Sequence, residues 1–149
     1  MYTVKARVDF EAAHRLYNAN TYAEECRKNL HGHSYKVDVE VASTELNDAN
    51  MVIDFKLLKS ILKEVIHDKY DHSCILNSAD PLCKPIQESC EKVIVVDANP
   101  SAEWMAEEFC KTIQQAMWDA HLIDAVVFRV SVQETENNIA VYGRLMWEG

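Results

Sequence analysis

Polar and apolar residues alternate from Ser34 to Val41, and this alternation constrains the fold more than any other feature of the chain. Successive side chains of a β-strand point to opposite faces, so a strand with one buried face shows this pattern. The residues on the apolar face are Tyr35, Val37, Val39 and Val41. Counting back in steps of two places His31 and His33 on the same face. An extended strand here holds two imidazoles on one side, where together they can bind one metal ion.

Three other segments alternate in the same way and are predicted to be strands, at residues 3–14, 126–132 and 139–146. The strand that contains Tyr35 is expected to cover about residues 33–43. A short strand is also expected at Met51–Ile53, and Val93–Val96 is expected to be a short strand or an extended segment. The polar residues 15–30 predict a loop, and residues 77–92 predict a second loop with a short helix near 84–91.

Two amphipathic helices are predicted. Asp54 is typical of a helix N-cap, and the apolar residues that follow at helical spacing predict a helix over about residues 55–68. Pro100 suits a first helical turn, and an apolar stripe runs from there through Ala102–Met117. This order of elements favours an α+β fold with the helices on one face of an antiparallel sheet. At 149 residues the chain is expected to form one domain, residues 1–149.

Composition excludes several classes of function. The chain has 15 basic and 24 acidic residues, a net charge of −9, which argues against nucleic-acid or anionic-membrane partners but allows a phosphorylated small substrate. Its apolar runs are too short to span a membrane, and no targeting segment is evident, so a cytoplasmic protein is expected. The five cysteines are odd in number and include no Cys-x-x-Cys pair, so a disulfide framework is not expected.

A third histidine suggests a metal site. His14 has the same strand parity as Phe10, and the two strands that carry His14 and His31 can pair through the loop between them. Three imidazoles with an open fourth position are the donor set of catalytic zinc, and imidazole favours zinc over a redox metal here. The alternative is that these histidines are ordinary core or surface residues.

Cys26 lies just before this motif and has two interpretations. As a fourth zinc ligand it would close the site and make it structural. As a free thiol near a metal and the basic Arg27 and Lys28, it would have a lowered pKa and act as a nucleophile or base. The spacing alone leaves both open.

Two further sites carry weaker signals. The adjacent Asp71 and His72 suit an acid–base pair, in which the carboxylate fixes the imidazole tautomer; the alternative is an ordinary polar helix end. Glu134, at the end of a predicted strand, could accept two hydrogen bonds from a guanidine-like ring edge such as that of guanine or a pterin. The alternative for Glu134 is a polar hairpin turn.

Taken together, these motifs resemble the 6-pyruvoyltetrahydropterin synthase / 6-carboxytetrahydropterin synthase (QueD) family. The matching segments are Phe10–Leu16, Cys26 with His31–His33, Val52–Phe55, Tyr70–His72, Asn99–Glu103 and Glu134–Asn138. They occur in the family's order along nearly the whole chain. The resemblance implies the tunnelling fold (T-fold), a four-stranded antiparallel sheet with two helices on one face. Subunits of this fold assemble into an oligomeric β-barrel, as a trimer or hexamer.

The resemblance also implies roles for individual residues. The metal ligands would be His14, His31 and His33, holding Zn²⁺. The catalytic residues would be Cys26, Asp71 and His72. The pterin ring would be anchored by Glu134, with Thr135 beside it. The resemblance does not assign the cations that hold the triphosphate, and the basic residues Arg15, Arg27 and Lys28 are the candidates.

The implied substrate is 7,8-dihydroneopterin triphosphate. The 6-carboxy reaction, which releases acetaldehyde and triphosphate on the pathway to queuosine, is the favoured expectation. The alternatives are the 6-pyruvoyl reaction of the biopterin pathway and a non-catalytic zinc- or pterin-binding protein. Three features depart from the 6-carboxy pattern. The gap between Cys26 and His31 has four residues, between the three typical of the 6-carboxy branch and the five of the 6-pyruvoyl branch. The segment Glu134–Tyr142 is more similar to the 6-pyruvoyl branch, and the loop at residues 78–95 is long.

Overall fold

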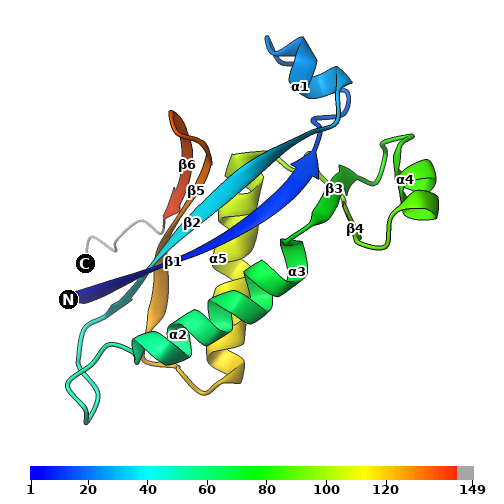
Figure 1. The fold of residues 1–149 in the computed structure, drawn as a ribbon. Coiled ribbons are helices and arrows are strands. Elements are labelled where there is room, and N and C mark those ends of the chain that lie inside the picture. Colours follow the sequence, from blue (N-terminus) through cyan, green and yellow to red (C-terminus); the bar gives the residue numbers. More distant parts are fainter. Residues whose placement is uncertain (144–149) are drawn as a thin grey trace.

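The computed structural model describes residues 1–143. It shows a curled six-stranded sheet with helices on one face (Figure 1). The strands are β1 (Tyr2–His14), β2 (His31–Ser43), β3 (Ser73–Asn77), β4 (Val93–Val96), β5 (Val126–Thr135) and β6 (Asn138–Gly143). Their order in the sheet is β4-β3-β1-β2-β5-β6. β1, β2, β5 and β6 pair antiparallel, whereas β3 runs parallel to both β1 and β4. The predicted α+β architecture is confirmed.

The predicted strand count of four is too low, because two short parallel strands extend the sheet beyond β1. β3 was not predicted, since four of its five residues are buried and it lacks the alternation of a half-buried strand. β4 covers the apolar segment Val93–Val96, where a short strand was one of the two expectations. The long antiparallel strands agree with the sequence pattern, although the predicted last strand extended to residue 146, and residues 144–146 lie outside the described part.

The strand predicted at Met51–Ile53 is wrong. The Asn47 side-chain oxygen accepts hydrogen bonds from the main-chain N–H groups of Ala49 and Met51, at 2.9 and 3.0 Å. The Asn47 main-chain N–H also donates to the Met51 carbonyl at 2.9 Å. These bonds satisfy the loop backbone locally, so it does not need a strand partner.

The helices are α1 (Glu24–Lys28), α2 (Phe55–Leu62), α3 (Asp68–Tyr70), α4 (Cys83–Ser89) and α5 (Ala102–Asp119), with a π-helical turn η1 (Lys63–His67) that joins α2 to α3. Asp54 caps α2 as predicted, accepting from the N–H groups of Lys56 and Leu57. Ser101 caps α5 through the N–H of Trp104, so this helix starts after Pro100. α4 confirms the expected short helix, whereas α1 lies inside residues 15–30, where only a loop was expected.

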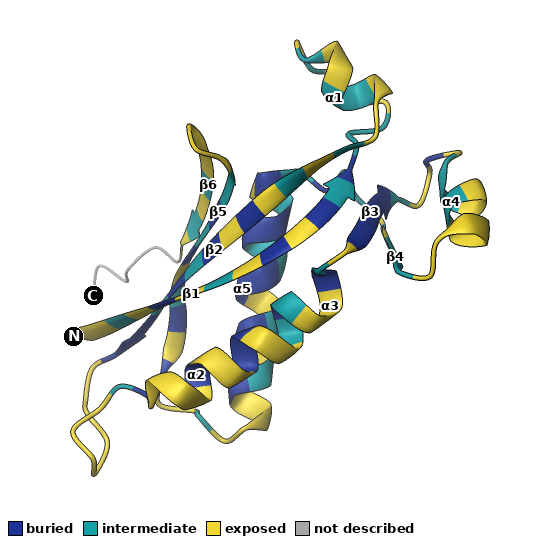
Figure 2. Cartoon of the chain, in the orientation of Figure 1, coloured by how far each residue is buried: buried dark blue, intermediate teal, exposed yellow. Residues whose placement is uncertain are grey.

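One face of the sheet packs on α2 and α5, and the other is charged. Buried and exposed residues alternate along β1 and β2 in Figure 2. On the buried face, Phe10 stacks on Tyr35 with ring centroids 4.8 Å apart. On the opposite face, Arg7 donates two hydrogen bonds to Asp38, at 2.9 and 2.8 Å. Among residues 1–143, no helix is both long and apolar enough to cross a membrane.

The register between β1 and β2 determines where the histidines lie. The two strands pair without interruption from Tyr2 opposite Ser43 to His14 opposite His31. Because parity is kept along the whole ladder, the end that carries His14 also presents His31 and His33 on the buried face.

Candidate metal centre and active site

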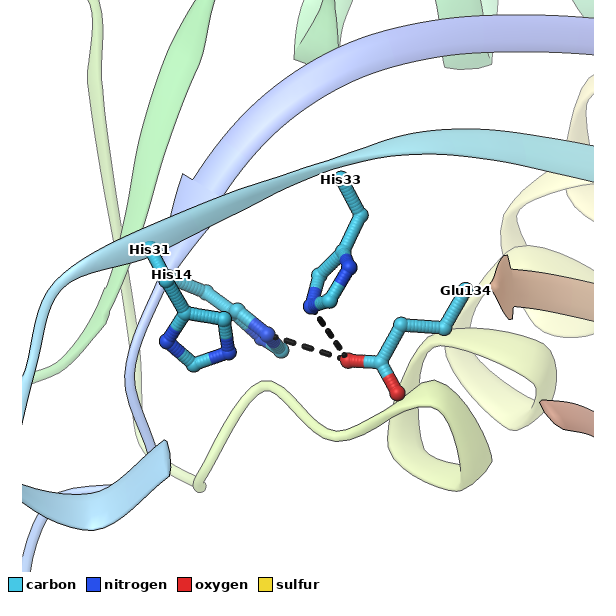
Figure 3. A group of neighbouring side chains, drawn as sticks. All are labelled: His14, His31, His33 and Glu134. Atoms are coloured by element: carbon cyan, nitrogen blue, oxygen red, sulfur yellow. Dashed lines mark ion pairs between the residues drawn. The ribbon is translucent and has the colours of Figure 1, made fainter. Parts of the chain in front are cut away.

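Three histidines converge at one end of the sheet (Figure 3). His14 ends β1, and His31 and His33 begin β2. The ring centroids are 4.7 Å apart for His14 and His31, 5.2 Å for His14 and His33, and 5.0 Å for His31 and His33. One ligand atom from each histidine and one from Glu134 lie within 4.8 Å of one another. These four side chains form the histidine–glutamate cluster.

Main-chain carbonyls fix the tautomers of two of these imidazoles. His14 Nδ1 lies 2.7 Å from the carbonyl oxygen of Pro100, and His31 Nδ1 lies 2.9 Å from that of Asn29. A carbonyl oxygen only accepts, so each Nδ1 carries the proton and each Nε2 of the neutral ring presents its lone pair. Carbonyl contacts of this kind orient histidines that bind metals.

The buried Nε2 atoms test whether a metal fits. Within residues 1–143, the Nε2 atoms of His14, His31 and His33 are buried and have no hydrogen-bond partner of regular geometry. Buried polar atoms without partners are rare, because each carries a desolvation cost. Three neighbouring Nε2 atoms satisfy that requirement if they bind a cation, so the residues present fit a metal ion.

Glu134 completes the cluster at a position the sequence did not predict. Its Oε1 lies 3.1 Å from His14 Nε2 and 3.0 Å from His33 Nε2. The contact with His14 lowers the pKa of the Glu134 carboxyl more than burial raises it, so the group is anionic at neutral pH. Burial lowers the pKa of His33 despite the nearby carboxylate, which favours its neutral form. The cluster therefore combines imidazole nitrogens with one anionic oxygen donor.

Tyr35 forms the floor of the cluster and was not identified as a site residue. Its ring packs edge-on against His14 and His33, with centroids 5.9 and 5.5 Å apart. Its hydroxyl is buried and, in the described part of the chain, has no hydrogen-bond partner. Burial and the charge of Glu134 raise the pKa of Tyr35. The sequence did contain a signal for Tyr35, because it lies an even number of residues from His31 and His33 and therefore faces the same side of the strand.

Cys26 lies in α1, beyond the paired ends of β1 and β2 (Figure 1), and it is not one of the four clustered residues. The N–H of Leu16 donates to its carbonyl at 2.9 Å, which ties α1 to the chain leaving β1. Burial raises the pKa of the thiol, and the charges of Glu25 and Glu134 raise it further. A thiolate at neutral pH would therefore need a cation close to the sulfur.

Asp71 and His72 contact each other, as the pair interpretation requires. His72 Nδ1 lies 2.7 Å from Asp71 Oδ2, and the N–H of Glu11 donates to Asp71 Oδ1 at 2.8 Å. This main-chain bond is the main reason that the pKa of Asp71 is lowered, and His72 lowers it further. Lys92 Nζ supports the turn by donating to the Asp71 carbonyl at 2.6 Å.

Within the described part of a single copy of the protein, the Asp71–His72 pair does not interact directly with the histidine–glutamate cluster. The His72 side chain is 82% exposed, whereas that of His14 is 1% exposed. No hydrogen bond or ion pair between the two groups occurs within residues 1–143. His72 instead borders two surface clefts of about 330 and 630 Å³, and the first is also lined by Glu11 and Ser34.

The predicted substrate-binding residues lie in two places. Arg15 forms a two-point ion pair with the buried Asp80, with 2.6 Å from Nε to Oδ2 and a second contact from Nη2 to Oδ1. Arg15 also lines a surface cavity of about 240 Å³ together with Arg27 and Lys28. Thr135 is exposed at the end of β5, next to Glu134.

The fold and the site together define a class: an α+β protein whose curled sheet carries a three-histidine, one-carboxylate cluster that could bind a metal. The family model described as 6-pyruvoyl tetrahydropterin synthase matches residues 3–144. The chain therefore belongs to the 6-pyruvoyl tetrahydropterin synthase family, whose members are lyases.

Relatives and solved structures agree with this family. The chain is 33% identical to the 6-carboxy-5,6,7,8-tetrahydropterin synthase of Aquifex aeolicus, over 89% of this chain and 92% of that protein. It is 29% identical to the 6-pyruvoyl tetrahydrobiopterin synthase of Dictyostelium discoideum, over 89% of both. The Caenorhabditis elegans 6-pyruvoyl tetrahydropterin synthase structure has a TM-score of 0.68 at 23% identity, covering 97% of this chain and 96% of that one. These likenesses confirm the T-fold.

Proposed function

We propose that this chain is a zinc-dependent 6-carboxytetrahydropterin synthase, which converts 7,8-dihydroneopterin triphosphate to 6-carboxy-5,6,7,8-tetrahydropterin, acetaldehyde and triphosphate. The observation that carries the proposal is the convergence of three buried Nε2 atoms without hydrogen-bond partners. The name of the Aquifex aeolicus relative supports the choice of product.

The histidine–glutamate cluster would hold the metal through His14, His31 and His33. A donor set of three imidazoles suits Zn²⁺, which has no redox chemistry and accepts tetrahedral N and O donors. When bound, zinc supplies a Lewis acid that acidifies the hydroxyl groups of the substrate side chain and their neighbouring C–H bonds.

Cys26 and the Asp71–His72 pair would move protons to and from the side chain of the substrate. Asp71 accepts from His72 Nδ1, so it stabilises the imidazolium that forms when Nε2 takes up a proton. Cys26 would act as a base only as a thiolate, which the side chains around it disfavour in the absence of a cation.

We also propose that the protein is a homo-oligomer in which each site is completed by a neighbouring copy. His72 is exposed and has no hydrogen bond or ion pair with the cluster among residues 1–143, although His33 lines one of the same clefts. A pair on one copy can then serve the cluster of the next. Such sharing fits closed, symmetric oligomers, in which every copy makes the same contact.

The two ends of the substrate would occupy different surfaces. Arg15, Arg27 and Lys28 line one cavity and together can bind a triphosphate, because guanidinium and ammonium groups donate several charge-assisted hydrogen bonds to phosphate oxygens. Glu134 would accept two hydrogen bonds from the pterin ring, with Thr135 beside it.

The 6-pyruvoyl reaction is the second candidate, favoured by the likeness to the Dictyostelium discoideum protein and by the sequence of the segment Glu134–Tyr142. Incubation with 7,8-dihydroneopterin triphosphate separates the two. Acetaldehyde released in step with triphosphate supports the 6-carboxy reaction, and triphosphate without acetaldehyde supports the 6-pyruvoyl reaction. If neither product forms with the metal-loaded protein, both proposals are wrong.

A further inference from the structure

Glu134 borders two different sites. Its Oε1 lies in the histidine–glutamate cluster, at 3.1 Å from His14 Nε2 and 3.0 Å from His33 Nε2 (Figure 3). Glu134 also lines a surface cavity of about 430 Å³, together with Asn137 of the β5–β6 turn, Asn138 at the start of β6 and Glu103 of α5. A carboxylate in this place can serve the metal position or a ligand in the cavity.

The carboxylate oxygen faces two imidazole Nε2 atoms, so a positive charge is needed between them, and a metal ion bound by both sides supplies it. His14 donates its Nδ1 proton to Pro100, so its Nε2 offers an unprotonated lone pair to Glu134. An anionic oxygen 3.1 Å from an unprotonated nitrogen is repelled unless a positive charge lies between them, either a proton on the nitrogen or a metal ion bound by both. Two ligands of a tetrahedral zinc ion, each about 2.0–2.1 Å from the metal, lie about 3.3 Å apart. The contacts of Glu134 Oε1 are close to that separation.

The backbone at Glu134 explains how its side chain reaches the cluster. β5 and β6 pair Gln133 with Ile139 and Thr135 with Asn138, and the register shifts between Gln133 and Thr135. Glu134 is therefore the extra residue of a β-bulge. Bulges bend the strand and re-aim side chains, and they are frequent next to active sites.

We infer that Glu134 is an exchangeable fourth ligand of the metal. In the free protein its carboxylate occupies the fourth coordination position, and when substrate binds, the carboxylate leaves that position and binds the pterin ring. This rests on the proposed metal site and pterin substrate. The amino-pyrimidinone edge of a pterin offers two N–H donors side by side, which pair with both oxygens of one carboxylate. Recognition of the ring in the cavity then opens the position that the side-chain hydroxyl groups of the substrate need.

This exchange couples two binding events. A ligand with the ring edge draws Glu134 away from the cluster, and a small anion that binds the metal competes with Glu134 for the same position. Because coupling between sites is reciprocal, the ring ligand and the anion each strengthen the binding of the other. A permanently open site predicts no such coupling.

Cobalt(II) in place of zinc makes the exchange visible, since its visible absorption reports the ligands. The protein is loaded with Co²⁺ as wild type, Glu134→Gln, Glu134→Asp and Glu136→Gln, the last being a control on an exposed residue of the same turn. We expect Glu134→Gln to bind Co²⁺ at least 10-fold more weakly and azide at least 10-fold more tightly than wild type. Glu136→Gln should match wild type. Glu134→Asp, whose carboxylate is shorter by one methylene group, should bind azide more tightly than wild type.

Pterin itself, which has the ring but not the side chain, completes the test. In the wild-type Co²⁺ protein we expect pterin to strengthen azide binding at least 5-fold, and in Glu134→Gln to leave it unchanged. Equal azide affinities in wild type and both Glu134 variants, or no effect of pterin on the wild type, would overturn the exchange while leaving the metal site intact. If wild type binds no metal, the proposed function itself fails.

Discussion

His14 and Pro100 are joined by a hydrogen bond of 2.7 Å from the imidazole Nδ1 to the main-chain carbonyl, across 86 residues of sequence. The bond links the end of β1 to the segment just before α5. Because a main-chain carbonyl cannot be changed by mutation, it fixes the tautomer and rotation of His14 whatever side chain occupies position 100. The cluster is therefore oriented by the backbone before any metal binds.

Removal of the metal is expected to lower the melting temperature. The cluster leaves three buried Nε2 atoms without hydrogen bonds unless a cation binds them. Zinc at 100 times its Kd stabilises a protein by about 2.7 kcal/mol, and each kcal/mol shifts Tm by about 2–4 °C at this chain length. We expect treatment with a chelator to lower Tm by about 5–10 °C and added Zn²⁺ to restore it, as followed by circular dichroism.

In His33→Ala the chelator should have little effect, whereas His121→Ala, at an exposed position, should respond like wild type. A wild-type Tm that is insensitive to the chelator and to Zn²⁺ contradicts the metal site.

Two inactive variants are expected to restore activity when mixed. Cys26→Ala and His72→Ala each remove one proposed proton-transfer group, and if a site takes Cys26 from one copy and His72 from its neighbour, some mixed sites are intact. After co-unfolding and refolding in equal amounts, about a quarter of the sites of a symmetric oligomer have both groups. The measurement is turnover of 7,8-dihydroneopterin triphosphate.

The control mixture is Cys26→Ala with His33→Ala, which on this proposal belong to the same copy's site and should give no recovery. Recovery in the control, or none in the test mixture when each variant is shown to assemble, would show that the two groups are not divided between copies in this way.

As the pH falls below about 4, the pair of Arg15 and Asp80 should progressively lose its stabilising contribution to the fold. Burial raises the pKa of Asp80, but the Arg15 guanidinium and the Leu82 N–H lower it more, so the folded pKa is below the unfolded one. A lowered folded pKa means that the stabilising contribution is complete above the unfolded pKa of about 3.9 and is lost as pH falls through the folded value. Its measure is the free energy of unfolding, by denaturant titration at several pH values.

Asp80→Asn is the matched variant, because its side-chain oxygen can still accept from Leu82. It leaves a largely buried Arg15 charge without its partner and is expected to reduce the free energy of unfolding by about 3 kcal/mol at pH 7. The difference from wild type should shrink as the pH falls below 4. A difference that stays constant from pH 7 to pH 3 would mean that the ionised carboxylate contributes nothing.

The strand pattern predicted the cluster because parity carries over an uninterrupted ladder. Counting by twos placed His31 and His33 on one face, and the register of β1 with β2 then brings His14 opposite His31. Glu134 could not be placed in the cluster in this way. It lies at a register shift between Gln133 and Thr135, and a bulge breaks the counting rule on which the prediction depended.

Other features of the fold could not be predicted from the sequence, because they depend on contacts between segments that are far apart along the chain. β3 is buried along most of its length, so its residues show no alternation, and its parallel pairing joins segments 61 residues apart at Ala12 and Ser73. The sequence did predict that Asp71 and His72 could form a pair, and the structure shows the bond. It could not show that His72 is exposed, because exposure depends on how the chain turns at His72, whose φ of 58° lies in the left-handed region.

The ring of Tyr35 and its hydroxyl are expected to contribute differently to stability. The ring packs between Phe10 and the histidines, whereas the buried hydroxyl has no hydrogen-bond partner among residues 1–143. Tyr35→Phe keeps the ring and removes an unsatisfied polar atom, so the free energy of unfolding should stay the same or rise by up to ~1 kcal/mol. Tyr35→Ala removes a large buried aromatic side chain and should lower it by about 3–5 kcal/mol. Chemical denaturation of the metal-free protein measures both.

If Tyr35→Phe proves more than about 1 kcal/mol less stable than wild type, the hydroxyl has a partner in solution. Unchanged stability with reduced turnover in Tyr35→Phe would instead assign the hydroxyl to the reaction.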